Sequence, residues 1–131
     1  MPGIHIPALQ GIAGLNPIIT TGSQVASANQ ATNITVATIP SDKIGILTDL
    51  AFVPLVYGLT NAWLAVYVPT AAMQYFIDWK PTLAAYTAMR VNCLIALPPG
   101  GEIRFGFTAG TNNTTITYGA SYILFDYFGE D

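Results

Sequence analysis

Apolar and polar residues alternate in the second half of this chain, in runs that Pro and Gly clusters interrupt. Residues 86–97 alternate, a Pro-Pro-Gly-Gly turn follows at residues 98–101, and residues 102–107 alternate again. Successive side chains of a strand point to opposite faces, so a period of two predicts strands with one buried face. The sequence therefore predicts antiparallel strands joined by tight turns.

About eight such strands, each bounded by turn residues, follow one another along the chain. This spacing is typical of an all-β protein, and we expect an antiparallel two-sheet sandwich of the jelly-roll type. An immunoglobulin-like sandwich is the alternative fold. It is less favoured because the chain has a single cysteine and therefore no Cys-Trp-Cys pattern.

The first part of the chain shows no sustained period and is rich in Gly, Pro, Ala, Ser and Asn. The sequence predicts an extended N-terminal arm at residues 1–30 and a β-sandwich domain at residues 31–131. Within the arm, residues 4–6 and 17–20 are expected to add short strands to a sheet edge. Residues 22–30 are expected to form a flexible connector.

For two residues and one segment of the predicted strands, the sequence predicts a specific local structure. Pro54 interrupts a long apolar run, and because proline lacks an N–H it is expected at a sheet edge or a bulge. Gly119 predicts a bulge or a close approach of two backbones. Residues 73–79 alternate and are expected to form a strand, although Thr70 and Pro81 would also suit the two ends of a helix.

Charged residues make up 8% of the chain, against roughly 25% in an ordinary soluble domain. The net charge of -3 argues against a nucleic-acid binder that works through a basic patch, and the hydrophobic content of 52% argues against disorder. Neutral polar residues supply part of the surface. We expect neighbouring subunits to cover the rest, at the uncharged arm and at residues 51–77 and 105–125.

The uncharged window at residues 51–77 is long enough to cross a bilayer. Pro54, Gly58 and Pro69 interrupt it, so one continuous helix is not expected. The N-terminal segment has no basic n-region and no unbroken apolar core, so a usual signal peptide is not expected either. The sequence does not favour a membrane partner.

Residues with catalytic or metal-binding chemistry are scarce. His5 and Cys93 are the single histidine and cysteine, too few for a tetrahedral metal site. Cys93 lacks an evident partner for nucleophilic catalysis and is expected to be a small buried hydrophobe. Asp42 and Asp49 are close in sequence, but any seven acids allow such a pairing. We expect no enzyme activity, no catalytic or metal-binding residues and no cofactor.

Candidate subunit contacts come from apolar segments and from the few arginines. Trp63 lies in a segment that is apolar on both faces, which suits a core or an interface. Arg90 and Arg104 lie on the polar faces of predicted strands, and we expect them at subunit contacts, paired with acids such as Asp126 or Glu102. The predicted interface residues are Ile4, Ile6, Ile18, Ile19, Trp63, Tyr67, Arg90, Arg104, Tyr122 and Asp126.

Aromatic side chains on an exposed face also stack on sugars. Trp63, Trp79 and several tyrosines would serve this purpose if they were accessible. A lectin-like carbohydrate-binding module is therefore the alternative function.

The uncharged arm, the Thr-rich and Asn-rich surface, the few charges and the series of strands together resemble small virion structural proteins. These are jelly-roll capsid subunits and the decoration or tail proteins of bacterial and archaeal viruses. The resemblance implies a non-enzymatic protein of the virion that self-assembles into a homo-oligomer, for example a trimer, and contacts other virion proteins. Because the chain has no basic segment, no direct contact with nucleic acid is expected.

Overall fold

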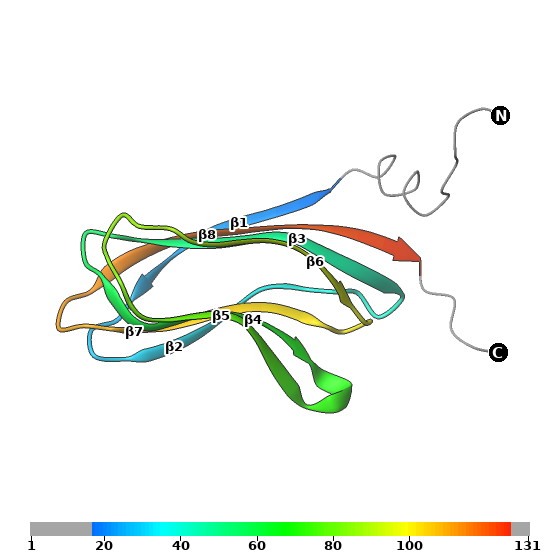
Figure 1. Cartoon of the computed structure of the whole chain (residues 1–131), viewed down its shortest axis with the longest axis horizontal. Coiled ribbons are helices and arrows are strands. Elements are labelled where there is room, and N and C mark those ends of the chain that lie inside the picture. Colours follow the sequence, from blue (N-terminus) through cyan, green and yellow to red (C-terminus); the bar gives the residue numbers. More distant parts are fainter. Residues whose placement is uncertain (1–16, 127–131) are drawn as a thin grey trace.

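A computed structural model describes residues 17–126 of the chain, and the interface residues Ile4 and Ile6 predicted above lie outside this range. The described part consists almost entirely of strands with short connections (Figure 1). The elements are β1 (Ile18–Ala26), β2 (Ala31–Thr38), β3 (Lys43–Leu55), β4 (Leu59–Val68), the 3-10 turn η1 (Pro69–Ala71), β5 (Met73–Leu83), β6 (Met89–Leu97), β7 (Glu102–Ala109) and β8 (Thr114–Asp126).

The strands form two four-stranded antiparallel sheets that pack face to face (Figure 1). One sheet has the strand order β1-β8-β3-β6 and the other has the order β2-β7-β4-β5. Apart from the β4–β5 hairpin, each connection carries the chain from one sheet to the other. This strand order is that of a jelly roll, so the predicted fold is confirmed and the immunoglobulin-like alternative is wrong.

The core between the sheets is aromatic at its centre. Phe52 of β3 and Phe105 of β7 stack across the sandwich with ring centroids 4.5 Å apart, and Phe107 packs beside both rings. All three are almost fully buried. Leucine and isoleucine side chains from both sheets complete the core, among them Leu47, Leu50, Leu64, Ile103 and Ile116.

β1 corrects the predicted boundary of the sandwich. It pairs with β8 along its whole length, from Ile18 opposite Tyr122 to Ala26 opposite Thr114. The sandwich therefore begins by Ile18 rather than at residue 31, and half of the expected connector at 22–30 belongs to a strand. β1 has one strand neighbour and buries few side chains, so its sequence shows no alternation.

Local expectations for Pro54 and Gly119 are confirmed. Pairing between β3 and β6 stops at Phe52 opposite Met89, so Pro54 has a strand neighbour on one side only. A Cβ on Gly119 would lie 3.3 Å from the Thr21 side chain, which shows the close approach of β8 to β1.

The segment at residues 51–77 is built from strands. It contains the end of β3, all of β4, the turn η1 and the first half of β5. The strand predicted at residues 73–79 is confirmed, and the helical alternative is wrong. Among residues 17–126, no helix has the length and apolar character needed to cross a membrane.

Candidate assembly surfaces

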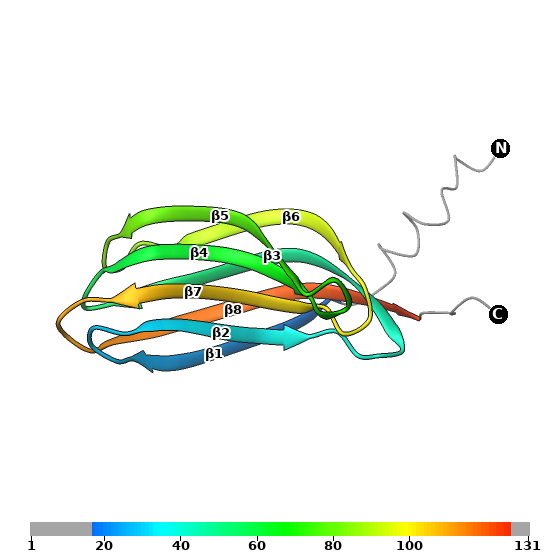
Figure 2. The same cartoon turned by 90° about the horizontal axis from the view of Figure 1, so that it is seen from below.

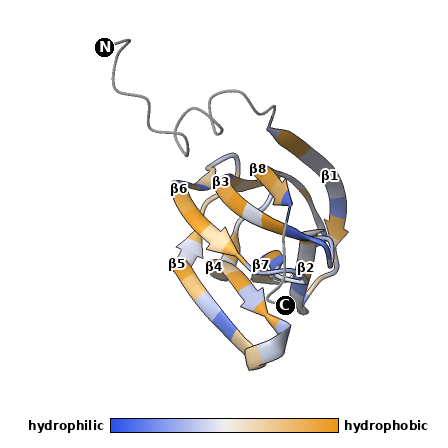
Figure 3. Ribbon diagram, turned by 90° about the vertical axis from the view of Figure 1, so that its right-hand side faces the viewer, coloured by the Kyte–Doolittle hydropathy of each residue, from blue (hydrophilic) through white to orange (hydrophobic). Residues whose placement is uncertain are grey.

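The tip of the β4–β5 hairpin bends away from the opposite sheet (Figures 1 and 3). β5 lies at the edge of its sheet, and among the strands of residues 17–126 its neighbour is β4 alone. Its side chains are therefore exposed along most of the strand. Met73, Tyr75, Phe76 and Trp79 are each between 48% and 59% exposed. Large apolar side chains on a free edge make β5 the first candidate contact surface.

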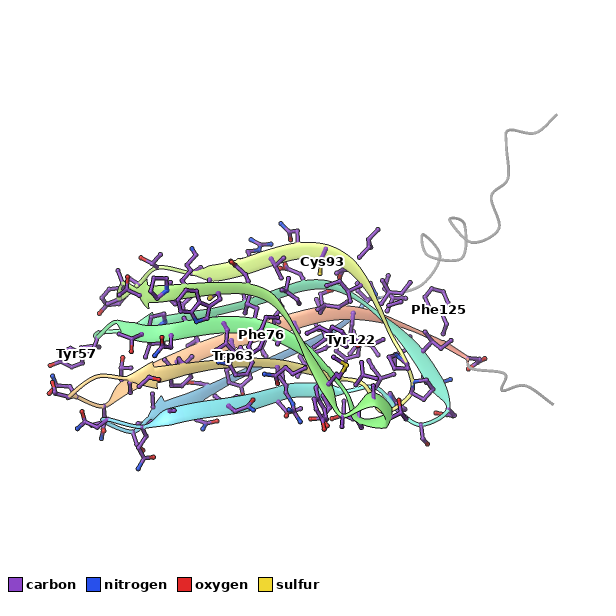
Figure 4. All side chains as sticks on the ribbon, turned by 60° about the horizontal axis from the view of Figure 1, so that its bottom comes forward. Tyr57, Trp63, Phe76, Cys93, Tyr122 and Phe125 are labelled. Atoms are coloured by element: carbon purple, nitrogen blue, oxygen red, sulfur yellow. The ribbon has the colours of Figure 1, made fainter. Side chains whose placement is uncertain are left out.

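An aromatic patch, made of Trp63, Phe76 and Trp79, covers the outer face of β4 and β5. Trp63 pairs with Trp79 across the two strands, and its ring meets Phe76 edge-on with centroids 5.4 Å apart (Figure 4). Gly106 of β7 lies beneath the indole, because a Cβ at this position would be 2.7 Å from Trp63 Nε1. The glycine thus lets the indole lie against the backbone of the neighbouring strand.

Arg104 lies next to the aromatic patch and is held within its own subunit. Its guanidinium sits 3.9 Å from the centre of the Tyr67 ring. It donates hydrogen bonds to Glu102 Oε1 at 2.8 Å and 3.1 Å, and to Gln74 Oε1 at 3.3 Å. The expected partner Glu102 is therefore found two residues away on the same strand, and the expectation of a pair across subunits is corrected.

Arg90 and Asp126 are also paired within the subunit, but not with each other. Arg90 donates to both carboxylate oxygens of Asp49, at 2.8 Å and 3.2 Å, and Lys43 donates to Asp126. These hydrogen bonds favour the charged bases and raise the pKa of Arg90 and of Lys43. The expected pairing of an arginine with Asp126 is wrong because the β3–β8 register sets Lys43 opposite Asp126.

The free edge of β1 is a second candidate contact surface. Ile18, Ile19 and Val25 are 38%, 70% and 59% exposed there. Ile18 and Ile19 were predicted as contacts, and the structure leaves both accessible. Tyr122, also predicted, is 8% exposed and belongs to the core of its own sandwich, so it is withdrawn as a contact (Figure 4).

Exposed apolar residues also gather at one end of the sandwich, where β3 joins β4 and β5 joins β6. Val56, Tyr57 and Tyr86 are 59%, 46% and 70% exposed. The Tyr86 N–H donates to the Pro54 carbonyl at 2.7 Å, which ties the two connections together. Val56 has a φ of 78°, which is strained for a β-branched residue. This end is the third candidate surface.

Two shallow hollows lie on the outer face of the β1-β8-β3-β6 sheet, with volumes of about 360 and 560 Å³. Ala51 and Gly119 line both of them. The first also contains Asp49 and Arg90, which bind each other. Within residues 17–126 there is no group of three or more His, Cys, Asp and Glu side chains that could hold a metal.

Cys93 of β6 is half-buried, and its Sγ lies 3.5 Å from the Leu47 carbonyl oxygen, to which it donates. Burial raises the pKa of the thiol, and the negative charge of Asp49 raises it further. The thiolate is the reactive form, so a raised pKa slows alkylation and disulfide exchange near neutral pH.

We expect Cys93 to react with a thiol reagent at pH 8 about tenfold more slowly in the native protein than in urea. In the unfolded protein the reaction rate should level off once the thiol has ionised. In the native protein the pKa is raised, so the rate should still increase with pH above that range. A stopped-flow assay with an aromatic disulfide measures both rates. Equal rates in the native and unfolded protein would contradict this environment for Cys93.

Several exposed residues were missed as contacts by sequence reasoning. Pro81 marks β5 as an edge strand, and this signal identifies the neighbouring apolar residues as accessible. The β1 edge and the third candidate surface have no comparable signal in the sequence, because their exposure depends on the topology. The missed residues are Val25, Val56, Tyr57, Met73, Tyr75, Phe76, Trp79, Tyr86 and Leu94.

The strand order defines a single jelly-roll domain. No known protein family matches the sequence, and no curated protein matches it. Among solved structures, a chain of the infectious bursal disease virus Gx strain aligns over 85% of this chain and 32% of its own length, with 14% identity and a TM-score of 0.46. A chain of the Gt strain aligns over 86% and 33%, with 10% identity and a TM-score of 0.44. This chain thus spans about a third of the length of those chains.

Proposed function

We propose that this chain is a non-enzymatic structural subunit that self-assembles through uncharged surfaces, as a capsid, decoration or tail component of a virion. The observation that carries the proposal is the placement of its exposed apolar side chains. Eleven large hydrophobic residues are exposed in the described part of the chain. Ten of them lie on two sheet edges and one end, as contact surfaces do, and Leu94 of β6 is exposed by itself.

The distribution of charge supports the same function. Three ion pairs, Lys43–Asp126, Arg90–Asp49 and Arg104–Glu102, are closed within the subunit. Their charges are already neutralised locally, so burying the apolar surface beside them would take few unpaired charges out of water. Asp78 and Lys80 of β5 lie outside these three pairs, so an interface at β5 would keep both in contact with water. The subunit would associate through apolar side chains, whose removal from water is favourable.

Not every charge-free stretch needs a neighbour. Residues 105–125 lie mainly in β7 and β8, which are interior strands and pack within the subunit's own sheets. Residues 51–77 include Val56, Tyr57 and Phe76, which are exposed. Coverage by a neighbour is therefore proposed for residues 51–77, whereas the subunit's own core accounts for residues 105–125.

Electron microscopy of the purified full chain tests the proposal. We expect repeating assemblies, such as rings, sheets or closed particles, in wild-type protein at micromolar concentration. Phe76→Ser should disperse them, because it removes a ring that is 59% exposed on the aromatic patch. Asn92→Ser, at an exposed position of β6 outside the three candidate surfaces, is the control and should leave them intact. Dispersed single subunits in wild-type samples at every concentration would contradict the proposal.

The aromatic patch also favours the second candidate function, a lectin-like carbohydrate-binding module. Trp79 is 53% exposed and lies beside Trp63 and Phe76, which together offer a stacking platform. Titration with neutral mono- and oligosaccharides should then shift tryptophan fluorescence, and Trp79→Ala should abolish the shift. Absence of any shift with wild-type protein would exclude this alternative.

A further inference from the structure

The two sides of the sandwich differ in a way that bears on how copies associate. β1 and β2 run along one side, and β5 and β6 run along the other (Figure 2). Within residues 17–126, each of these four strands has a strand neighbour on one side, and its other edge leaves backbone N–H and C=O groups unpaired. A free edge is a template for another strand unless side chains or irregularities prevent pairing.

The β5 and β6 side carries features that prevent strand pairing. β6 has the charge of Arg90 and a register shift against β3, between Leu47 and Asp49. Pro81 lacks an N–H, and the carboxylate of Asp78 accepts a hydrogen bond from the Trp79 N–H at 2.9 Å. The register of β5 against β4 also shifts, between Leu64 and Ala65. Charges, proline and bulges are the usual protections of a sheet edge. Association at β5 would therefore use its side chains rather than its backbone.

β1 has none of these protections. It pairs with β8 without a register shift over all nine residues, and it contains no charged residue and no proline. β2 and the turn between the two strands are also uncharged, so the whole side is neutral. A regular, uncharged edge strand is open to pairing with another chain.

The sequence of β1 matches itself when it is reversed. With Gly22 opposite the partner's Gly22 in an antiparallel pair, Ile19 faces the partner's Val25 and Thr21 faces the partner's Ser23. Along a strand, the N–H and C=O groups of alternate residues point to opposite edges, so the groups that do not face β8 belong to every second residue of β1. In this register each of those residues faces a residue of the same set in the partner, and their N–H and C=O groups can hydrogen-bond. Apolar side chains meet apolar ones and polar side chains meet polar ones, since Thr20 faces the partner's Gln24.

The area of this side suits a dimer. Nine residues span about 30 Å of strand, and two sheets packed about 10 Å apart give a side wall about 20 Å thick. Such a wall buries about 600 Å² on each copy, which reaches the lower end of specific interfaces. Because the side is uncharged, this burial requires no charge to be desolvated.

We propose that two copies of this chain join through β1, in antiparallel register with Gly22 facing Gly22 across a twofold axis, so that two four-stranded sheets become one continuous sheet. This inference rests on the proposed self-assembly and specifies one of its contacts. A twofold contact uses the same surface on both copies, which is why self-complementarity of β1 is the relevant property.

Disulfide cross-linking of the full chain tests the register. In a Cys93→Ala background, Ile19→Cys combined with Val25→Cys should form a covalent dimer with oxidised glutathione as the oxidant, because residues 19 and 25 face each other across the axis. Either single variant should give at least tenfold less dimer, since each cysteine lies six residues, or about 20 Å, from its own copy in the partner. The same separation prevents a bond within one strand.

A second pair of variants tests the contact without a covalent bond. Ser23→Lys sets two positive charges near the axis and should weaken dimerisation at least tenfold in sedimentation equilibrium. Asn92→Lys makes a similar change at an exposed position of β6, on the opposite side and outside the three candidate surfaces, and should have no effect. If wild-type protein assembles but the double cysteine variant links no better than the singles, the β1 pairing is wrong while self-assembly stands. If wild-type protein remains monomeric throughout, both proposals fail.

Discussion

Replacing Phe105 by alanine is expected to lower the free energy of unfolding by about 3–5 kcal/mol. The ring is fully buried, stacks on Phe52 and lies 5.1 Å from the centre of the Tyr118 ring. Its removal leaves a cavity between the two sheets, which a rigid sandwich closes only in part. Urea unfolding at fixed protein concentration, followed by tryptophan fluorescence, measures the loss.

Phe76→Ala is the matched control, because it makes the same substitution on the surface. Its side chain is 59% exposed, so the stability of the subunit should change by less than about 0.5 kcal/mol. The two variants should therefore separate folding from assembly. Similar losses of stability at both positions would contradict the division between core and contact surface.

Gly106→Ala is expected to destabilise the subunit by about 1–3 kcal/mol and to displace the Trp63 indole. The sign of this effect is informative. Glycine inside a strand is normally less stable than alanine by about 0.5–1 kcal/mol, so the substitution would stabilise a site with free space. Here the new methyl group would enter the space occupied by the indole.

Two comparisons isolate the indole as the cause. Gly110→Ala should be neutral or stabilising, because nothing lies within 4 Å of a Cβ at that position. In a Trp63→Ala background, the penalty of Gly106→Ala should disappear, since the two residues are in direct contact. An unchanged penalty in that background would show that the indole does not lie over Gly106.

Much of the fold was predictable because buried strands leave a readable pattern. Strands that bury one face, such as β6 and β7, alternate over most of their length, and the turn at residues 98–101 separates them clearly. The positions of Pro54 and Gly119 also followed from their chemistry, since one lacks an N–H and the other lacks a side chain. The jelly-roll class could be derived from these features together.

β1 and the ion pairs could not be predicted, for different reasons. β1 is an edge strand whose side chains are mostly exposed, so its residues face no requirement to alternate. The ion pairs depend on the register between distant strands, which brings Lys43 to Asp126. Sequence patterns within one strand contain no information on that register.

The sequence predicted that the functional surfaces are uncharged contact surfaces, but it did not predict where most of them lie on the fold. Few charges and many apolar residues indicated contact surfaces, and Ile18 and Ile19 are indeed exposed at a sheet edge. Tyr122 was misplaced because an aromatic residue in an interior strand suits a core as well as an interface. Pro81 and the charges of β5 are visible in the sequence, but only the topology shows that β1 is also an edge strand.

Light scattering coupled to size-exclusion chromatography tests the central claim most directly, because it measures the mass of the full chain in solution. The chain has a mass of 13.9 kDa. Self-assembly through uncharged surfaces predicts a mass of at least twice this value at micromolar concentration, with little change as salt is raised. A stable 13.9 kDa monomer across the whole concentration range would contradict the claim.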